Sequence, residues 1–253
     1  MAIRSKLLIP ILFFFAFTAS AHTFAVNADG QIDTAQSQFG GASGLFDGTG
    51  DYITAPDSTD FNLSADFTIS LWVRFNAEGT FGLTATENGG GTGWQFYVVT
   101  NGGSPSLHVW SGAGTDRNNA WDPTTNTWYH VALVRSGTTV TMFIDGTSIG
   151  TVADGDFNND SGPLGVATAS GNAINAVLNG WIDELTIQKG TARWTGNFTP
   201  PASEDDQCIL TNVKVLLHMN GADASTTFTD DSVTACGGGS TADSSEGILI
   251  QQW

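Results

Sequence analysis

Apolar and polar residues of this chain alternate with a period of two in several segments, most clearly between Trp128 and Gly150. Every second residue from Tyr129 to Leu133 falls on one face, and the alternation resumes at Val140. Asp145-Gly146 supplies the two positive-φ residues that a type I′ turn requires. The pattern therefore predicts three antiparallel strands joined by two tight turns.

Two further runs predict long strands. From Phe67 to Phe75 the odd positions are apolar, so that a register shift of one residue would turn the whole apolar set to solvent. In the run from Gly180 to Gly190, the alternation places Trp181, Asp183, Leu185 and Ile187 on one face, and it places the adjacent carboxylates Asp183 and Glu184 on opposite faces. Gly-, Asn- and Asp-rich turns separate the remaining short apolar runs, which is typical of an all-β domain.

Chain length and net charge limit the classes of protein to which this chain can belong. With 253 residues, 40% of them hydrophobic, the chain can bury a substantial core. Its net charge of −17 repels phosphate backbones and anionic headgroups, which argues against a nucleic-acid partner.

The first 21 residues and the two cysteines bear on where the protein works. Arg4 and Lys6 precede an apolar stretch too short to span a bilayer and a small-residue box at 19–21, so we expect residues 1–21 to be a secretory signal peptide and the mature form to have no membrane span. The alternative is an N-terminal strand. In an exported protein Cys208 and Cys236 are expected to form a disulfide, whereas in a reducing compartment both thiols would be free.

Five motifs resemble one known family. "FGGASGLFDGTGDY", "DFTISLWVRF", "WYHVALVRSGTTVTMFIDG", "IDELTI" and "ARWTGNFTPP" are similar, in order and spacing, to laminin-G-like domains of the concanavalin A-like lectin/glucanase superfamily, a type found in bacterial surface and phage structural proteins. The resemblance implies a two-sheet antiparallel, jelly-roll-like sandwich, which we assign to residues 22–201. Pro200-Pro201 ends this unit, and residues 202–253 form an acidic linker and a C-terminal segment.

The C-terminal segment contains a strand that the family usually places first. "VKVLLHMNGADASTTFTDDS" begins at Val213, and its strand covers residues 213–219. Three alternatives stay open: a circular permutation in which this strand completes its own sheet, a truncated second domain, or donation of the strand to a neighbouring copy.

The resemblance implies a non-catalytic, secreted or virion-surface domain for glycan recognition or adhesion. The alternative is a structural assembly or decoration protein, working as a homo-oligomer or among virion or filament neighbours. A glycoside hydrolase is a distant third, because no run places two carboxylates on one strand face. A Ser-His-Asp triad has no nucleophile elbow to support it, and His130 and His218 lie in predicted strands where a packing role is expected.

Candidate ligand-binding residues follow from exposure and chemistry. Sugar rings stack on exposed aromatic rings while polar neighbours bind the hydroxyl groups. Four tryptophans within motif strands, Trp72, Trp94, Trp128 and Trp181, are expected to be structural. The glycan-site candidates are Trp121, Trp110, Arg117 and Asp116.

Calcium is the expected ion, because relatives in the superfamily often bind it through loop carboxylates. The candidate ligands are Asp47, Asp51 and Asp183. The competing role for these short carboxylates is to cap Gly-rich turns by accepting backbone N–H groups.

Overall fold

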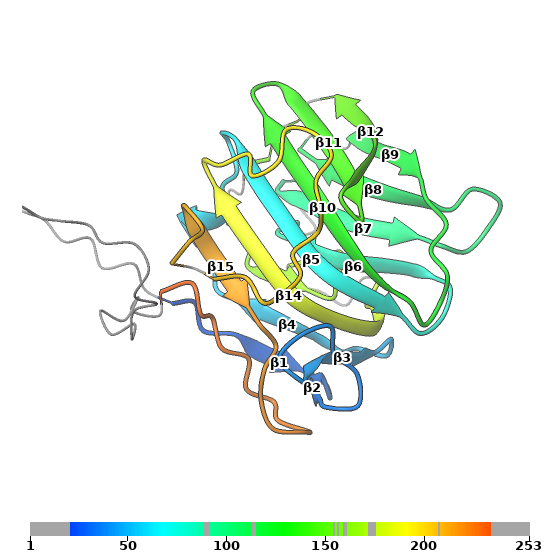
Figure 1. Cartoon of the computed structure of the whole chain (residues 1–253), viewed down its shortest axis with the longest axis vertical. Coiled ribbons are helices and arrows are strands. Elements are labelled where there is room, and N and C mark those ends of the chain that lie inside the picture. Colours follow the sequence, from blue (N-terminus) through cyan, green and yellow to red (C-terminus); the bar gives the residue numbers. More distant parts are fainter. Residues whose placement is uncertain are drawn as a thin grey trace, which may run out of the picture.

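The computed structural model describes residues 21–233 apart from 89–91, 113–114, 154, 156, 159–160, 172–175 and 207. In these residues two antiparallel sheets lie face to face, which confirms the predicted sandwich (Figure 1). No helix among the described residues is long and apolar enough to cross a membrane. The seven-stranded sheet contains, in spatial order, β1 (Ala25–Asn27), β4 (Tyr52–Ala55), β13 (Leu164–Val166), β6 (Thr80–Ala85), β7 (Trp94–Val99), β8 (Ser106–Ser111) and β9 (Thr115–Ala120).

The second sheet carries the long predicted strands. Its order is β12 (Thr147–Ala153), β11 (Thr139–Ile144), β10 (Trp128–Ser136), β5 (Phe67–Phe75), β14 (Asn179–Lys189), β3 (Ser43–Asp47) and β2 (Gln31–Asp33), with β15 (Val213–Leu217) paired to β14. A short 3-10 helix, η1 (Thr59–Phe61), connects β4 to β5. We call this the β5 sheet and the other the β7 sheet.

The core lies between the two sheets and follows the predicted alternation. The odd residues of β5 are almost completely buried in it, as are Val131 and Leu133 of β10. Trp94 is fully buried in this core, and its indole N–H donates to the Phe61 carbonyl (3.0 Å). The indole therefore gains the burial of a large ring while its one polar atom is satisfied.

The predicted meander is confirmed, including its second turn. β10 pairs with β11 and β11 with β12, and Ile144 pairs with Thr147 across Asp145-Gly146. The φ angles of Asp145 (48°) and Gly146 (74°) are both positive, as a type I′ turn requires.

Gly146 offers a test of how the turn is packed. A methyl group on Gly146 would collide with the Phe198 carbonyl oxygen, whereas one on Gly137, which also has a positive φ, would meet nothing within 4 Å. We expect Gly137→Ala to cost about 1 kcal/mol from backbone strain. Gly146→Ala should cost at least about 3 kcal/mol, because the collision adds to the strain. Denaturant midpoints would check this, and equal losses in the two variants would contradict it.

The displaced C-terminal strand pairs within its own chain. One edge of β14 is bonded to β5 along nearly its whole length, while the other edge is shared by β3, opposite residues 179–182, and β15, opposite residues 185–188. Figure 1 shows β15 in orange beside the yellow β14. The structure thus agrees with the permutation alternative, and β15 occupies half of an edge that would otherwise be open.

A β-bulge in β14 changes the direction in which its side chains point from the direction that the sequence predicted. Asp183 pairs with Trp72 and Thr186 with Ser70, so two residues of β14 lie opposite Leu71 alone. Glu184 has a φ of 53°, and both Leu185 and Ile187 belong to the core. The predictions that Asp183 shares a face with Leu185, and that Asp183 and Glu184 point to opposite faces, are therefore wrong. The sequence pattern could not reveal this, because one extra residue reverses every later side chain.

Residues 190–206, which we call the strap, cross the outer face of the β5 sheet after β14 ends (Figure 1). Trp194 and Phe198 stack on each other (ring centroids 3.9 Å apart) and pack against Ala132, Val134 and Phe143. The strap thus buries the middle of this face.

Candidate functional site

The outer face of β7, β8 and β9 carries a regular three-by-three array of side chains, which we call the β7–β9 face. The strand registers place its members in three cross-strand rows: Gln95, Trp110 and Asp116; Tyr97, His108 and Asn118; Val99, Ser106 and Ala120. Directly opposed side chains in a sheet lie close enough to contact one another. The array therefore forms one continuous surface containing two aromatic rings, an imidazole and several hydrogen-bonding groups.

The surface is open to solvent over most of these positions. Asp116, Asn118 and Ala120 are exposed, and Tyr97 and Trp110 are partly exposed. On the neighbouring strands, Gly82 and Gly165 lie against residues 168–171, which cover that part of the same outer face. The β7–β9 face is thus an uncovered area bordered by a loop.

Polar contacts hold the middle of the array in place. The His108 ring stacks on Tyr97 (4.6 Å between centroids), its Nδ1 lies 3.0 Å from the Asp116 carboxylate, and its Nε2 lies 2.8 Å from the Ser106 hydroxyl. Burial together with the Asp116 carboxylate raises the pKa of Tyr97. Tyr97 therefore stays a neutral hydrogen-bond donor, and the rings are oriented before any ligand arrives.

The contacts of Ser106, His108 and Asp116 follow the order of a hydrolytic triad, but the serine is poorly placed for attack. Ser106 lies within a strand and is only 7% exposed, and its hydroxyl is 3.1 Å from the Ser104 carbonyl, to which it can donate. A nucleophilic serine usually projects from an exposed turn. This chain of contacts is better explained as a means of fixing the imidazole.

A depression of about 450 Å³ continues the array at one end. Ser106, Asn118 and Ala120 line it together with residues 104–105 and Trp121-Asp122. The Trp121 ring packs edge-on against Phe75 (5.9 Å) and Tyr129 (5.4 Å), so part of it supports the core while part faces the depression.

The structure separates the four predicted glycan-site residues. Trp110 and Asp116 are cross-strand partners on the β7–β9 face, and Trp121 lies at its end. Arg117 points the other way, since its strand partner Val109 is in the core and its guanidinium donates to the Ser111 hydroxyl (2.9 Å). Sequence reasoning missed Tyr97, His108 and Asn118. The polar alternation within β7 and β8 marks them as outward-facing, but it does not show that these strands are neighbours.

The three predicted calcium ligands are not assembled into one site. Asp51 accepts from the backbone N–H groups of Asp29 and Asp47, and Asp47 accepts from that of Thr49. Asp183 accepts from Gln38 and Phe39. Across the described ranges no three His, Cys, Asp or Glu side chains are grouped to hold a metal. The observed contacts are those of turn capping, and calcium binding remains a prediction.

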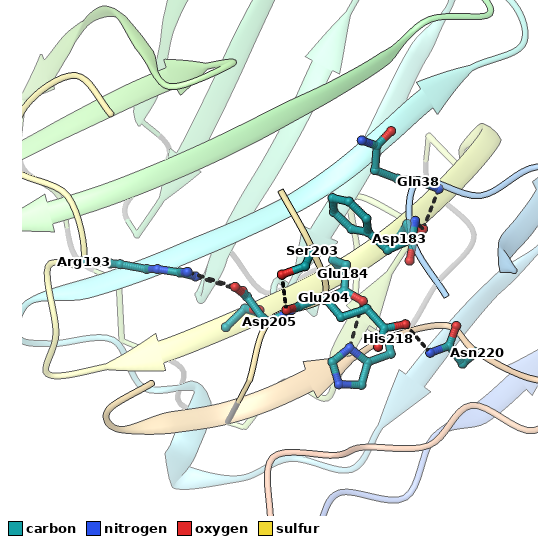
Figure 2. Close-up of polar contacts among 11 residues, drawn as sticks. Gln38, Asp183, Glu184, Arg193, Ser203, Glu204, Asp205, His218 and Asn220 are labelled. Carbon is teal, nitrogen blue, oxygen red and sulfur yellow. Dashed lines mark hydrogen bonds and ion pairs between the residues drawn. The ribbon is translucent and has the colours of Figure 1, made fainter. Parts of the chain in front are cut away.

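A buried polar network surrounds the bulge in β14, on the outer face of the β5 sheet (Figure 2). Glu184 accepts from the Asp205 backbone N–H (2.8 Å) and lies 2.8 Å from Nδ1 of His218, the residue that follows β15. This contact raises the pKa of His218, because the adjacent carboxylate favours the protonated ring. Asp205 in turn forms a two-pronged ion pair with Arg193 (both 2.8 Å).

Although Asp183 and Glu184 share one side of the sheet, they do not form a glycosidase pair. Asp183 is fully buried and Glu184 is 4% exposed, and both carboxylates accept hydrogen bonds from the chain segments that cover them. A glycosidase pair must flank a bond of the bound substrate. The network joins the segment before β3, the strap and β15, so its role is structural.

The predicted disulfide cannot be located, since Cys236 lies outside the described residues, as do residues 1–20 of the predicted signal peptide. Both features remain predictions.

Comparison with known proteins places the chain in a family. The family model described as "Concanavalin A-like lectin/glucanases superfamily" matches residues 47–194. No curated protein matches the chain.

Solved structures share the fold at low identity. A candidate carbohydrate-binding protein from Bacteroides ovatus matches with 14% identity and a TM-score of 0.55, over 85% of this chain and 57% of that one. The enzymatically active domain of tailspike protein 2 from bacteriophage CBA120 matches with 13% identity and a TM-score of 0.57, over 83% and 35%. The binding domain of botulinum neurotoxin serotype D matches with 12% identity and a TM-score of 0.50, over 73% and 45%. This chain therefore spans at most 57% of their lengths.

Proposed function

The chain belongs to the concanavalin A-like lectin/glucanases superfamily, and from that premise we propose that it is a non-catalytic carbohydrate-binding domain whose ligand lies on the β7–β9 face. The observation that carries this proposal is the array itself, in which partly exposed aromatic rings stand beside fixed hydrogen-bonding groups. A pyranose ring would stack on Trp110, and its hydroxyl groups would bond to Gln95, Asp116 and Asn118.

The depression beside Trp121 extends the same surface, so the proposed ligand is an oligosaccharide rather than a single sugar. A second ring would occupy this depression and contact Asn118 and Trp121. The domain would act outside the cell or on a virion surface, where such glycans are encountered.

The assembly alternative loses its main support, because β15 is engaged with β14 of the same chain. Donation of that strand to a neighbouring copy would leave half of the β14 edge open. Copies of this chain could still associate through other surfaces, but glycan binding does not require such association.

Trp110→Ala is expected to weaken binding to a neutral oligosaccharide, found by glycan-array screening, by at least about tenfold, because an aromatic residue at the centre of a site often contributes 2 kcal/mol or more. Titration calorimetry would measure the loss. Trp128→Ala, on the opposite sheet, should leave the affinity unchanged. Equal affinities of wild type and Trp110→Ala, or no binding to any glycan on the array, would contradict the proposal.

A further inference from the structure

Arg74 is unusual among the cationic side chains of this acidic protein. Within the described residues five of the six Lys and Arg side chains are engaged: Arg117 by Ser111, Arg135 by the carbonyls of Ser64 and Ala65, Lys189 by the carbonyl of Thr59, Arg193 by Asp205, and Lys214 by Asp60. Among these described residues, the Arg74 side chain has no hydrogen-bond or ion-pair partner. Its contact is with an aromatic ring, since its guanidinium lies over Trp181 at 4.7 Å from the ring centroid.

Arg74 lies in the middle of an aromatic row on the outer face of the β5 sheet. It pairs with Trp181 of β14 on one side and with Trp128 of β10 on the other, and Leu45 of β3 follows Trp181. All four side chains are partly exposed. Trp72 and Trp94 are buried, as expected of structural tryptophans, whereas Trp128 and Trp181 are partly exposed.

The strap leaves this row accessible. One row further along the same strands, Trp72 and His130 are buried beneath Phe39, Trp194 and Phe198. Asn76 and Asn179 lie in the other direction along these strands. Asn76 is exposed, and its side-chain amide donates to Oδ1 of Asn179 (3.0 Å). The Trp128–Arg74–Trp181 row is thus the last before a polar edge.

The geometry of Arg74 leaves its hydrogen-bonding capacity unused. A guanidinium that stacks on an indole uses its face, while its N–H donors lie in its plane and point outward. This in-plane fork matches the two oxygens of a carboxylate. Trp181 is held in place by a bond from its Nε1 to Asp33 Oδ2 (2.7 Å), so the platform under the fork is rigid.

We propose that the Trp128–Arg74–Trp181 row binds the carboxylate of an acidic sugar, as a site separate from the β7–β9 face. The carboxylate is bound by the guanidinium, and the sugar ring packs against Trp128 while Asn76 and Asn179 reach its hydroxyl groups. Two carboxylates face the area, Asp33, which is bonded to Trp181, and Asp47, the cross-strand partner of Asn179. These carboxylates and the net charge of −17 repel an anion, so binding of the carboxylate depends on the Arg74 guanidinium.

The test compares a galacturonic acid trisaccharide with the neutral galactose trisaccharide, following the indole N–H signals of Trp128 and Trp181 by NMR. We expect the acidic sugar to shift both signals and to bind at least about tenfold more tightly than the neutral one. Arg74→Gln should remove this difference. Arg74→Lys keeps the charge but not the fork, and should lose most of the affinity.

Controls separate this site from the β7–β9 face. Trp110→Ala should leave binding of the acidic trisaccharide unchanged, and all variants should keep a denaturant midpoint close to that of wild type. Unchanged affinity in Arg74→Gln, or an equal loss in Trp110→Ala, would overturn the assignment. Tighter binding of a sulfated galactose trisaccharide than of the uronic acid would overturn the choice of carboxylate.

Discussion

Truncation of the chain after Asn212 is expected to yield a protein that no longer unfolds cooperatively. The missing segment buries five apolar side chains, Val215, Leu216, Leu217, Met219 and Phe228, each at most 5% exposed. Burial of such a side chain contributes about 1.5 to 3 kcal/mol, so their summed loss is comparable to the whole stability of an ordinary domain. The truncation also opens the edge of β14 along residues 185–188.

The loss reaches beyond β15 itself. Phe228 stacks on Phe46 of the core (6.3 Å between centroids), and residues 224–225 exchange backbone hydrogen bonds with Ile32 of β2. The C-terminal segment therefore covers the β2–β3 end of the sheet as well. Tryptophan fluorescence during denaturant titration would show a broad, non-cooperative change in place of a single transition.

Complementation provides the control for this truncation. A synthetic peptide of residues 213–233 should restore a cooperative transition, whereas the same peptide with Leu217→Asp should not, because a carboxylate would enter the core. In the full chain, Ile209→Ala should have little effect, since Ile209 is 78% exposed. A truncated protein with the wild-type midpoint would show that β15 is dispensable.

Asp183 is expected to contribute stability that increases as the pH falls from about 7 towards 4. Burial raises the pKa of Asp183 from 3.8 to about 7, even though two backbone N–H groups donate to it. Between these two pKa values the folded state binds a proton that the unfolded state does not, so its stability increases with acidity. The full effect of such a shift is up to about 4 kcal/mol.

Asp183→Asn tests this directly. The amide oxygen can still accept from Gln38 and Phe39, and the amide carries no charge to bury, so the variant should be more stable than wild type at pH 8 by up to a few kcal/mol. Its free energy of unfolding, measured by denaturant titration from pH 4 to 8, should lack the Asp183 contribution, so its advantage over wild type should disappear as the pH falls towards 4. A wild-type slope in this variant would refute the role of Asp183.

His130 opposes the contribution of Asp183 over most of the same pH range. Its burial among Trp72, Trp194 and Phe198 lowers the pKa of His130 to about 4. Between about 6.5 and 4 the unfolded state therefore binds the proton first, and stability falls with acidity. His130→Gln should remove this loss while retaining the effect of Asp183, so the two contributions can be measured separately.

The alternation of polar and apolar residues predicts only part of the candidate site. Period two within β8 marks Ser106, His108 and Trp110 as outward-facing, whereas the prediction for Trp110 rests on its position at a strand end. The partners Tyr97 and Asn118 could not be identified, because cross-strand neighbours depend on which strands pair. Arg117 was misplaced because it is adjacent to Asp116 in a strand, where consecutive side chains point to opposite faces.

The pattern of apolar and turn residues predicts the all-β class, the register of β5 and the turn at Asp145-Gly146, because each of these depends on the preferences of a few consecutive residues. The two-sheet sandwich was implied by the resemblance to a known family. Contacts made in the folded chain establish that β15 completes the edge of β14, that a bulge turns Asp183 and Glu184 to one side, and that the strap covers Trp72 while leaving Arg74 accessible. These features depend on contacts between residues far apart in the chain. A local pattern carries no information about which distant segment will cover it.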